Sequence, residues 1–381
     1  MTDLPDIHGA SPPRFAAVRD AFAANFTNAP EGLDELGARF SVCIGGAPVI
    51  DLWGGHADTA RTQPFTDATL APVFSTGKAV MALMIATCVE RGLLDYEATV
   101  ASYWPTFGQA GKAGITVGQL MSHQAGLSGF SAPAEPTIWF DRQAVLDRLC
   151  AQPPMWAPGT ASGYHPITIG YLAGELFRIV DGRSMGTALR EDFAGPFDLD
   201  LWIGLPESEH DRVAQMRKPT AAPDLGPIDA IKTAAFLDRG SAPGGRGSSE
   251  WRQMEIPSAN LHGTAAGLAR MLTPLANGGR LDGRKVLSAA VLDQATRERI
   301  HGPDKVVPFE MSWAAGLMRN GELRKFGPNP ETVGHSGWGG SCAFADPVTG
   351  ISAAYVMTRQ SPHLLGDPRA LRLIKALYAG L

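Results

Sequence analysis

The chain has 381 residues and carries 33 Lys and Arg against 38 Asp and Glu, which gives a formal net charge of −5. Apolar residues make up 44% of the chain and charged residues 19%, a composition that is typical of globular proteins and excludes a disordered or fibrous chain. The mild acidity argues against a nucleic-acid-binding surface, which requires a clustered excess of basic residues. Because a chain of this length exceeds the size at which one core stops growing, we expect two structural regions.

The N-terminal stretch has neither a basic start nor an apolar centre, so it does not resemble a secretory signal. The longest apolar run, residues 80–89, is shorter than the ~20 residues of a membrane span. The four cysteines lie far apart without the spacing of a zinc site, which predicts reduced, buried thiols. They are Cys43, Cys88, Cys150 and Cys342. These features predict a cytoplasmic protein without a membrane partner.

The first half of the chain combines one hairpin with helices. Residues 15–26 predict an amphipathic helix, and residues 39–52 predict two strands around a Gly45-Gly46 turn. Residues 79–89 are apolar almost all round and are followed by Gly92, which is typical of a buried helix with a glycine after its end. Further helices are predicted over 115–121, 167–180, 184–193 and 264–275, with loops over 53–70, 153–166 and 219–257.

The last hundred residues change from helical to strand patterns. Strands are predicted over 312–318, 333–336, 342–346 and 351–358, and a final helix over 368–378. Strand patterns therefore occur at both chain ends, with helices between them. We expect an α/β domain made of residues 1–74 and 285–381, interrupted by a mainly helical domain over residues 75–284.

A serine and a lysine at the start of the buried helix form the first candidate site. The sequence contains no GxSxG elbow, no HExxH, no GxGxxG and no Walker loop, but Ser75 precedes Lys78 by three residues. This spacing places both side chains on one helix face, with the serine at the positive end of the helix dipole. A lysine among apolar residues has a lowered pKa and can accept a proton from a hydroxyl. The alternative is a helix cap followed by a lysine that reaches to solvent, which an otherwise apolar helix disfavours.

Two other segments carry candidate groups. Tyr164 lies in a loop rich in Pro and Gly, and a phenol beside a lysine would have a lowered pKa and could serve as a general base. The alternative for Tyr164 is an aromatic side chain that packs on its loop. The segment 334–341 is a strand that ends in glycines, whose exposed N–H groups could hold an oxyanion. The alternative for this segment is a glycine-rich edge strand or bulge.

Together these three elements resemble those of the serine β-lactamase/penicillin-binding-protein superfamily, and most of all the class C β-lactamase-like family VIII carboxylesterases. The order of Ser-x-x-Lys, a Tyr-x-Asn-like element and a Lys-Thr-Gly-like strand is similar. So are the stretches ITVGQLMSHQAGL (115–127), WAPGTASGYHP (156–166) and HSGWGGSCAFADPVTGISAAYVM (335–357). The resemblance covers nearly the whole chain. It implies an antiparallel sheet flanked by helices plus a helical domain, with the active site in the cleft between them.

The resemblance also implies roles for individual residues. Ser75 would be the nucleophile, Lys78 would keep Ser75 and Tyr164 deprotonated or orient the proton, and Tyr164 would act as general base and then protonate the leaving group. The backbone N–H groups of Ser75 and Trp338 would form the oxyanion hole. The expected substrate contacts are His335, Ser336, Gly337, Trp338, His165 and Gln124. No metal or organic cofactor is implied.

Two departures from the family pattern bear on the substrate. Pro166 occupies the place of the asparagine that contacts the substrate amide in lactamases, and His335 replaces the lysine that holds a β-lactam carboxylate. Both favour uncharged esters. The third motif can be aligned on His335-Ser336-Gly337 or on Trp338-Gly339-Gly340.

We therefore expect a serine carboxylesterase that hydrolyses short-chain, small-molecule esters through an acyl-enzyme, with weak β-lactam hydrolysis at most. The alternatives are a β-lactamase or D-Ala-D-Ala peptidase, an acyltransferase, and a non-catalytic binding protein on the same fold.

Overall fold

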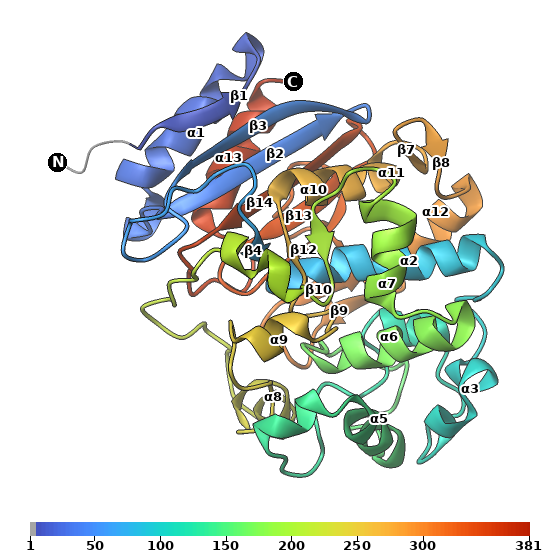
Figure 1. Ribbon diagram of the computed structural model, residues 1–381. Coiled ribbons are helices and arrows are strands. Elements are labelled where there is room, and N and C mark those ends of the chain that lie inside the picture. Colours follow the sequence, from blue (N-terminus) through green and yellow to red (C-terminus); the bar gives the residue numbers. More distant parts are fainter. Residues whose placement is uncertain (1–4) are drawn as a thin grey trace.

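The computed structural model describes residues 5–381 and is organised around a nine-stranded antiparallel sheet (Figure 1). In spatial order the strands are β1 (Ile7–Ala10), β3 (Ala47–Gly55), β2 (Gly37–Ile44), β14 (Ile351–Met357), β13 (Cys342–Asp346), β12 (Val333–Ser336), β11 (Met318–Arg319), β10 (Glu310–Trp313) and β9 (Ile300–Pro303). The two chain ends meet where β2 pairs with β14 in the middle of the sheet. The expected antiparallel sheet built from both ends of the chain is confirmed.

Helices cover both faces of this sheet. On one face lie α1 (Ala16–Thr27) and α13 (Pro368–Ala379), which contact each other, and on the other lie α2 (Gly77–Glu90), α10 (Ala265–Met271) and α11 (Thr273–Ala276). The other helices are α3 (Val100–Tyr103), α4 (Val117–Met121), α5 (Arg142–Ala151), α6 (Thr168–Asp181), α7 (Met185–Leu189), α8 (Ala230–Lys232), α9 (Ser249–Gln253) and α12 (Ala289–Thr296). Short strands β4 (Ala71–Pro72), β5 (Leu201–Trp202) and β6 (His262–Gly263) form a second sheet, and β7 (Arg280–Leu281) pairs with β8 (Arg284–Lys285).

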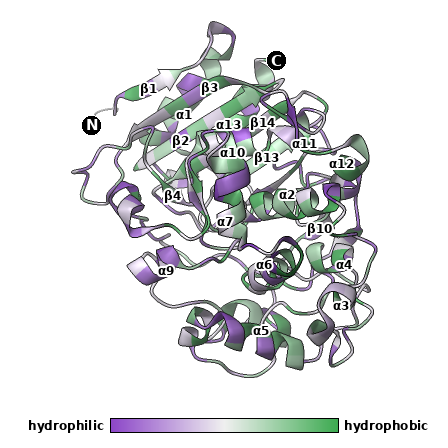
Figure 2. Cartoon of the chain, turned by 45° about the vertical axis from the view of Figure 1, so that its right-hand side comes forward, coloured by the Kyte–Doolittle hydropathy of each residue, from purple (hydrophilic) through white to green (hydrophobic). Residues whose placement is uncertain are grey.

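The two faces of the sheet bury different kinds of side chain. On β13, Phe344 belongs to the core beneath α1 and α13, whereas Ala343 and Ala345 belong to the core beneath α2, α10 and α11. This follows from the two-residue period of a strand. The small alanine side chains let the helices on that face approach the sheet closely. The helix α2, which is hydrophobic along its length in Figure 2, lies in the interior between the sheet and α6 as its sequence predicts.

Some predicted elements differ from the structure. The strand predicted over 312–318 is two short strands, β10 and β11, because the chain turns at Gly316, which has a φ of +82°. The predicted loop over 219–257 contains the short helices α8 and α9. The edge strands β1 and β9 were not predicted, because segments this short carry little alternation of apolar and polar residues.

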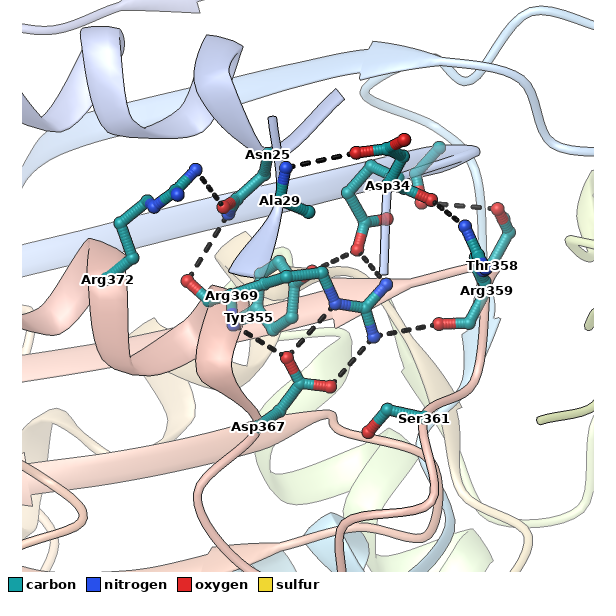
Figure 3. A network of polar contacts seen from close by, with 12 residues as sticks. Asn25, Ala29, Asp34, Tyr355, Thr358, Arg359, Ser361, Asp367, Arg369 and Arg372 are labelled. Atoms are coloured by element: carbon teal, nitrogen blue, oxygen red, sulfur yellow. Dashed lines mark hydrogen bonds and ion pairs between the residues drawn. The ribbon is translucent and has the colours of Figure 1, made fainter. Parts of the chain in front are cut away.

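A buried network of charged groups ties α13 to the sheet (Figure 3). The guanidinium of Arg369 is fully buried and pairs with Asp367 at 2.8 Å and with Glu35. The hydroxyl group of Tyr355 on β14 donates a hydrogen bond to the same Glu35 carboxylate. Because each charge in this network has an opposite charge or a hydrogen-bond donor beside it, removing one member would leave a buried charge unpaired.

The four cysteines are buried and free, as the sequence predicts. Over residues 5–381, no helix combines the length and apolarity that crossing a membrane requires. The strands of the large sheet lie within residues 7–55 and 300–357. The division of the chain into two domains at residues 74 and 285 stays a prediction.

Candidate active site

The tertiary structure places Ser75 and Lys78 in one buried polar cluster. Ser75 lies in the 3₁₀ turn Phe74–Thr76 that leads into α2, and Lys78 lies in the first turn of α2 with its side chain fully buried. The Lys78 Nζ lies 3.0 Å from the Ser75 Oγ, 2.7 Å from the carbonyl oxygen of Pro166 and 2.9 Å from that of Ser258. The lysine therefore does not reach solvent, which rules out the alternative interpretation of the motif.

The surroundings of Lys78 favour a neutral amine. Burial lowers the pKa of Lys78 well below its ordinary value, and among residues 5–381 no carboxylate forms an ion pair with it. A neutral amine has two N–H groups and one lone pair. Because the carbonyls of Pro166 and Ser258 can only accept hydrogen bonds, they take the two N–H groups. The lone pair then faces the hydroxyl of Ser75, which is the arrangement of a base with its proton donor.

Tyr164 contacts the same serine oxygen from the other side. Its hydroxyl donates a hydrogen bond of 2.6 Å to the Ser75 Oγ. Burial raises the pKa of the Tyr164 phenol above its ordinary value, and the negative charge of Asp304 raises it further. The expected lowering of this pKa by the lysine is therefore wrong, because a buried neutral amine supplies no positive charge. Tyr164 is a protonated donor in the resting site.

The third motif approaches Ser75 through His335-Ser336-Gly337, with Trp338 following. These four residues line one cavity together with Ser75 and Tyr164. A Cβ at Gly337 would lie 2.3 Å from the carbonyl oxygen of Val73, so only glycine allows β12 to lie this close to the serine turn.

Gly339 and Gly340 lie farther along, beyond the cavity. A Cβ at these positions would meet the side chains of Gln360 and Asp367 instead. All three residues of the alignment on His335 therefore line the cavity, whereas only Trp338 of the alignment on Trp338-Gly339-Gly340 does.

His335 faces Tyr164 as a neutral ring. Burial lowers the pKa of His335 to about 3. Its Nδ1 lies 2.7 Å from the Ser336 carbonyl oxygen, which can only accept, so Nδ1 carries the proton. Its Nε2 is buried without a hydrogen-bond partner among residues 5–381. The strand position that would hold a lysine in a β-lactam-binding member therefore carries no charge here.

Two of the predicted substrate contacts lie away from the cavity. His165 uses both ring nitrogens on the backbone, with Nδ1 at 2.6 Å from the Gly163 carbonyl and Nε2 accepting from the Leu127 N–H at 3.0 Å. Gln124 is buried and donates to the Ser122 hydroxyl at 2.6 Å. Neither residue lines the cavity, so both hold the loops behind Tyr164 in place.

The cavity itself has a volume of about 330 Å³ and a mostly apolar wall. Ser75 lies in this wall, and the predicted loop 219–257 supplies much of the opposite side. The aromatic and aliphatic lining includes Phe74, Phe236, Trp251, Met311, Trp313 and Leu365. An apolar cavity with a few polar groups beside a nucleophile is the usual form of a small-molecule site.

Sequence reasoning missed three residues that support the site. Ser258 offers its carbonyl to Lys78, Asp304 binds the backbone of Tyr164, and the ring of Trp313 lies parallel to the Tyr164 ring. They come from segments far from the motifs in sequence. A single Ser, Asp or Trp in a loop or strand carries no pattern from which these contacts could be inferred.

Comparisons with known proteins agree with this geometry. The sequence profile of the family described as Beta-lactamase matches residues 22–377. The chain is 37% identical to "Esterase/beta-lactamase LipL" of Mycobacterium tuberculosis over 95% of this chain and 85% of that protein.

Two solved structures are also similar over almost the entire chain. A penicillin-binding protein homolog from Caulobacter crescentus shares 56% identity with a TM-score of 0.96, covering 99% of this chain and 100% of that one. A family VIII carboxylesterase shares 39% identity with a TM-score of 0.91, with the same coverage.

Proposed function

The chain belongs to the beta-lactamase family, and we propose that within it this serine hydrolase of the esterase type hydrolyses short-chain carboxylic esters through an acyl-enzyme on Ser75. One observation carries the proposal. The Ser75 Oγ lies between the Nζ of Lys78 at 3.0 Å and the hydroxyl of Tyr164 at 2.6 Å, in the wall of an apolar cavity. A serine held between a base and a proton donor has what acyl transfer needs.

In the acylation step, the neutral Lys78 amine accepts the proton of Ser75 as the Oγ attacks the ester carbonyl. The N–H groups of Ser75 and Trp338 hold the oxygen on which negative charge develops. The C–O bond to the alcohol then breaks, and Tyr164 gives its proton to the departing alkoxide. The proton on Lys78 passes to the phenolate, so both groups return to their starting states.

Deacylation repeats these transfers with water in place of the alcohol. Water loses a proton to Lys78 as its oxygen attacks the acyl carbon, and the Ser75 oxygen takes a proton as it leaves. The products are a carboxylic acid and free enzyme. An acyltransferase would differ only in that a second alcohol, instead of water, enters at this step.

A second activity, β-lactam hydrolysis, is favoured by the relative whose name combines esterase and beta-lactamase. The uncharged His335 ring and Pro166, which has no side-chain amide, both favour the ester over the lactam. A non-catalytic binding protein has less support, since the Ser75, Lys78 and Tyr164 side chains are in contact.

The test measures p-nitrophenyl butyrate and nitrocefin turnover by the wild type and Ser75→Ala. We expect ester turnover that the Ser75→Ala variant loses, with much slower nitrocefin turnover. Wild-type ester activity in Ser75→Ala would remove Ser75 from the mechanism. Nitrocefin turnover as fast as ester turnover would overturn the preference for esters.

A further inference from the structure

The carboxylate of Asp304, in the segment between β9 and β10, is held behind the Tyr164 loop. It is 9% exposed and accepts five hydrogen bonds. The donors are the backbone N–H groups of Tyr164 at 2.9 Å, Val306 at 2.9 Å and Val307 at 3.1 Å, the Ser162 hydroxyl at 2.9 Å and the Trp313 indole at 3.2 Å. A carboxylate this well satisfied stays in place and fixes its donors.

Two of these donors determine where the Tyr164 phenol lies. One is the backbone N–H of Tyr164 itself. The other belongs to Trp313, whose ring is parallel to the Tyr164 ring, with 2° between the planes and 5.8 Å between the centroids. Asp304 thus holds both the main chain that carries the phenol and the aromatic surface against which the phenol lies.

We propose that Asp304 is a positioning residue that holds the Tyr164 hydroxyl on the Ser75 oxygen. It touches neither substrate nor reacting atoms, so it acts through Tyr164. Its charge also opposes ionisation of the phenol, since the negative carboxylate raises the pKa of Tyr164. The inference rests on the proposed role of Tyr164 as proton donor.

The test replaces the carboxylate by an amide of nearly the same shape in Asp304→Asn. We expect kcat for p-nitrophenyl butyrate to fall by roughly 10- to 100-fold, the scale of a slightly misplaced catalytic group, with little change in KM. The basic limb of the pH–rate profile should move to lower pH because the negative charge is gone. A folded variant with wild-type kcat and basic limb would overturn the proposal.

Ser162→Ala is the matched control, because it removes one hydrogen bond and keeps the charge. The basic limb of the pH–rate profile should stay in place in this variant. An equal shift of that limb in Ser162→Ala and Asp304→Asn would show that the shift comes from altered structure, and would overturn the claim that the charge of Asp304 raises the pKa of Tyr164. If Asp304→Asn does not fold, Trp313→Phe keeps an aromatic ring against Tyr164 but removes the indole N–H. We then expect a several-fold lower kcat with the basic limb in place, since the charge of Asp304 remains, and a wild-type kcat would overturn the proposal.

A second, independent observation concerns the charge of the cavity. Among the residues that line it, Arg246 is the only Lys, Arg, Asp or Glu. It lies at the exposed mouth, 5.9 Å from the Trp338 ring centroid, and within residues 5–381 it forms no ion pair. The cavity therefore offers a cation without a counter-ion, in the part of the cavity that Trp338 lines.

We infer that Arg246 binds a carboxylate of the substrate, so that the enzyme prefers esters whose acyl or alcohol group carries an acid. A guanidinium pairs with a carboxylate through two parallel hydrogen bonds, which fix the position of the carboxylate as well as balancing its charge. This deepens the proposed function by naming a substrate class, and it rests on that function.

The test compares p-nitrophenyl hexanoate with the p-nitrophenyl monoester of adipic acid, which has the same acyl length and a terminal carboxylate. The quantity to compare is kcat/KM for the acidic ester divided by kcat/KM for the hexanoate. We expect Arg246→Gln to lower this ratio by about tenfold or more, which is the effect of losing one hydrogen bond between charged groups.

Arg239→Gln, an exposed arginine of the same segment, is the control and should leave the ratio unchanged. An unchanged ratio in Arg246→Gln would overturn the inference. Absence of turnover of both esters by the wild type would instead refute the esterase function.

Discussion

The pH dependence of the wild-type enzyme distinguishes Lys78 from Tyr164 as the group that deprotonates Ser75. The structure places a lysine with a lowered pKa and a tyrosine with a raised pKa on the same oxygen. A neutral Lys78 can act at every pH above its lowered pKa. A Tyr164 base must first be ionised. We expect the rate to rise with pH as Lys78 loses its proton and then to stay level through the neutral range.

The two mechanisms differ by a large factor. Since the pKa of Tyr164 lies above its ordinary value of 10, fewer than about one phenol in 10³ is ionised at pH 7. A phenolate base would make kcat/KM climb about tenfold for each pH unit from 7 to 10. A Lys78 base predicts a profile that becomes flat once the pH exceeds the lowered pKa of the amine, well before pH 10.

The assay follows p-nitrophenyl butyrate hydrolysis at low substrate concentration between pH 5 and pH 10, with the rate of Ser75→Ala subtracted at each pH to remove hydrolysis by hydroxide. A slope near one in log kcat/KM against pH from 7 to 10 would refute the assignment of Lys78 as the base. A profile that is level at higher pH and declines only at pH values below a single pKa would agree with Lys78 as the base.

Three substitutions test other parts of the structure. Tyr164→Phe should lower kcat by roughly 10²-fold or more, the scale of a lost proton donor, and a normal rate would remove the phenol from the mechanism. In Gly337→Ala the new Cβ would lie 2.3 Å from the Val73 carbonyl oxygen. Esterase activity should therefore fall, and the free energy of unfolding measured in urea should drop by about 1–3 kcal/mol. Full activity would show that the turn around Ser75 can shift to accommodate the methyl group. Phe344→Ala, which empties a fully buried site stacked on Phe326, should cost about 3–5 kcal/mol of unfolding free energy with the catalytic contacts intact. A loss below 1 kcal/mol would contradict the packing described for β13.

Local signals in the sequence were sufficient for much of the fold. Three of these signals are the apolar run that forms α2, the Gly45-Gly46 turn between β2 and β3, and the short apolar runs of β13 and β14. Each depends on neighbours a few residues away. The edge strand β1 depends on pairing with β3, which lies far along the chain, and β9 depends on pairing with the next strand, β10. For segments this short, that pairing determines the strand and the local pattern does not.

For the site, the sequence by itself determined which side chains could do the chemistry. Ser75 and Lys78 share a helix face through their three-residue spacing, and Tyr164 lies on a loop that can present a phenol. Only the tertiary structure decided how these groups ionise, because the pKa of a buried group depends on desolvation and on charges brought from elsewhere in the chain. Burial of the phenol, together with the negative charge of Asp304, reverses the expected shift of the Tyr164 pKa.

The charge of the cavity was decided in the same way. From the sequence, the resemblance to the family implies that His335 replaces the lysine of a β-lactam-binding strand. Packing of the loop 219–257 against the cavity then places Arg246 among its lining residues, over the ring of Trp338. Composition and spacing describe a residue only relative to its neighbours in the chain. Which segments together line the cavity depends on long-range packing, and no local pattern encodes that packing.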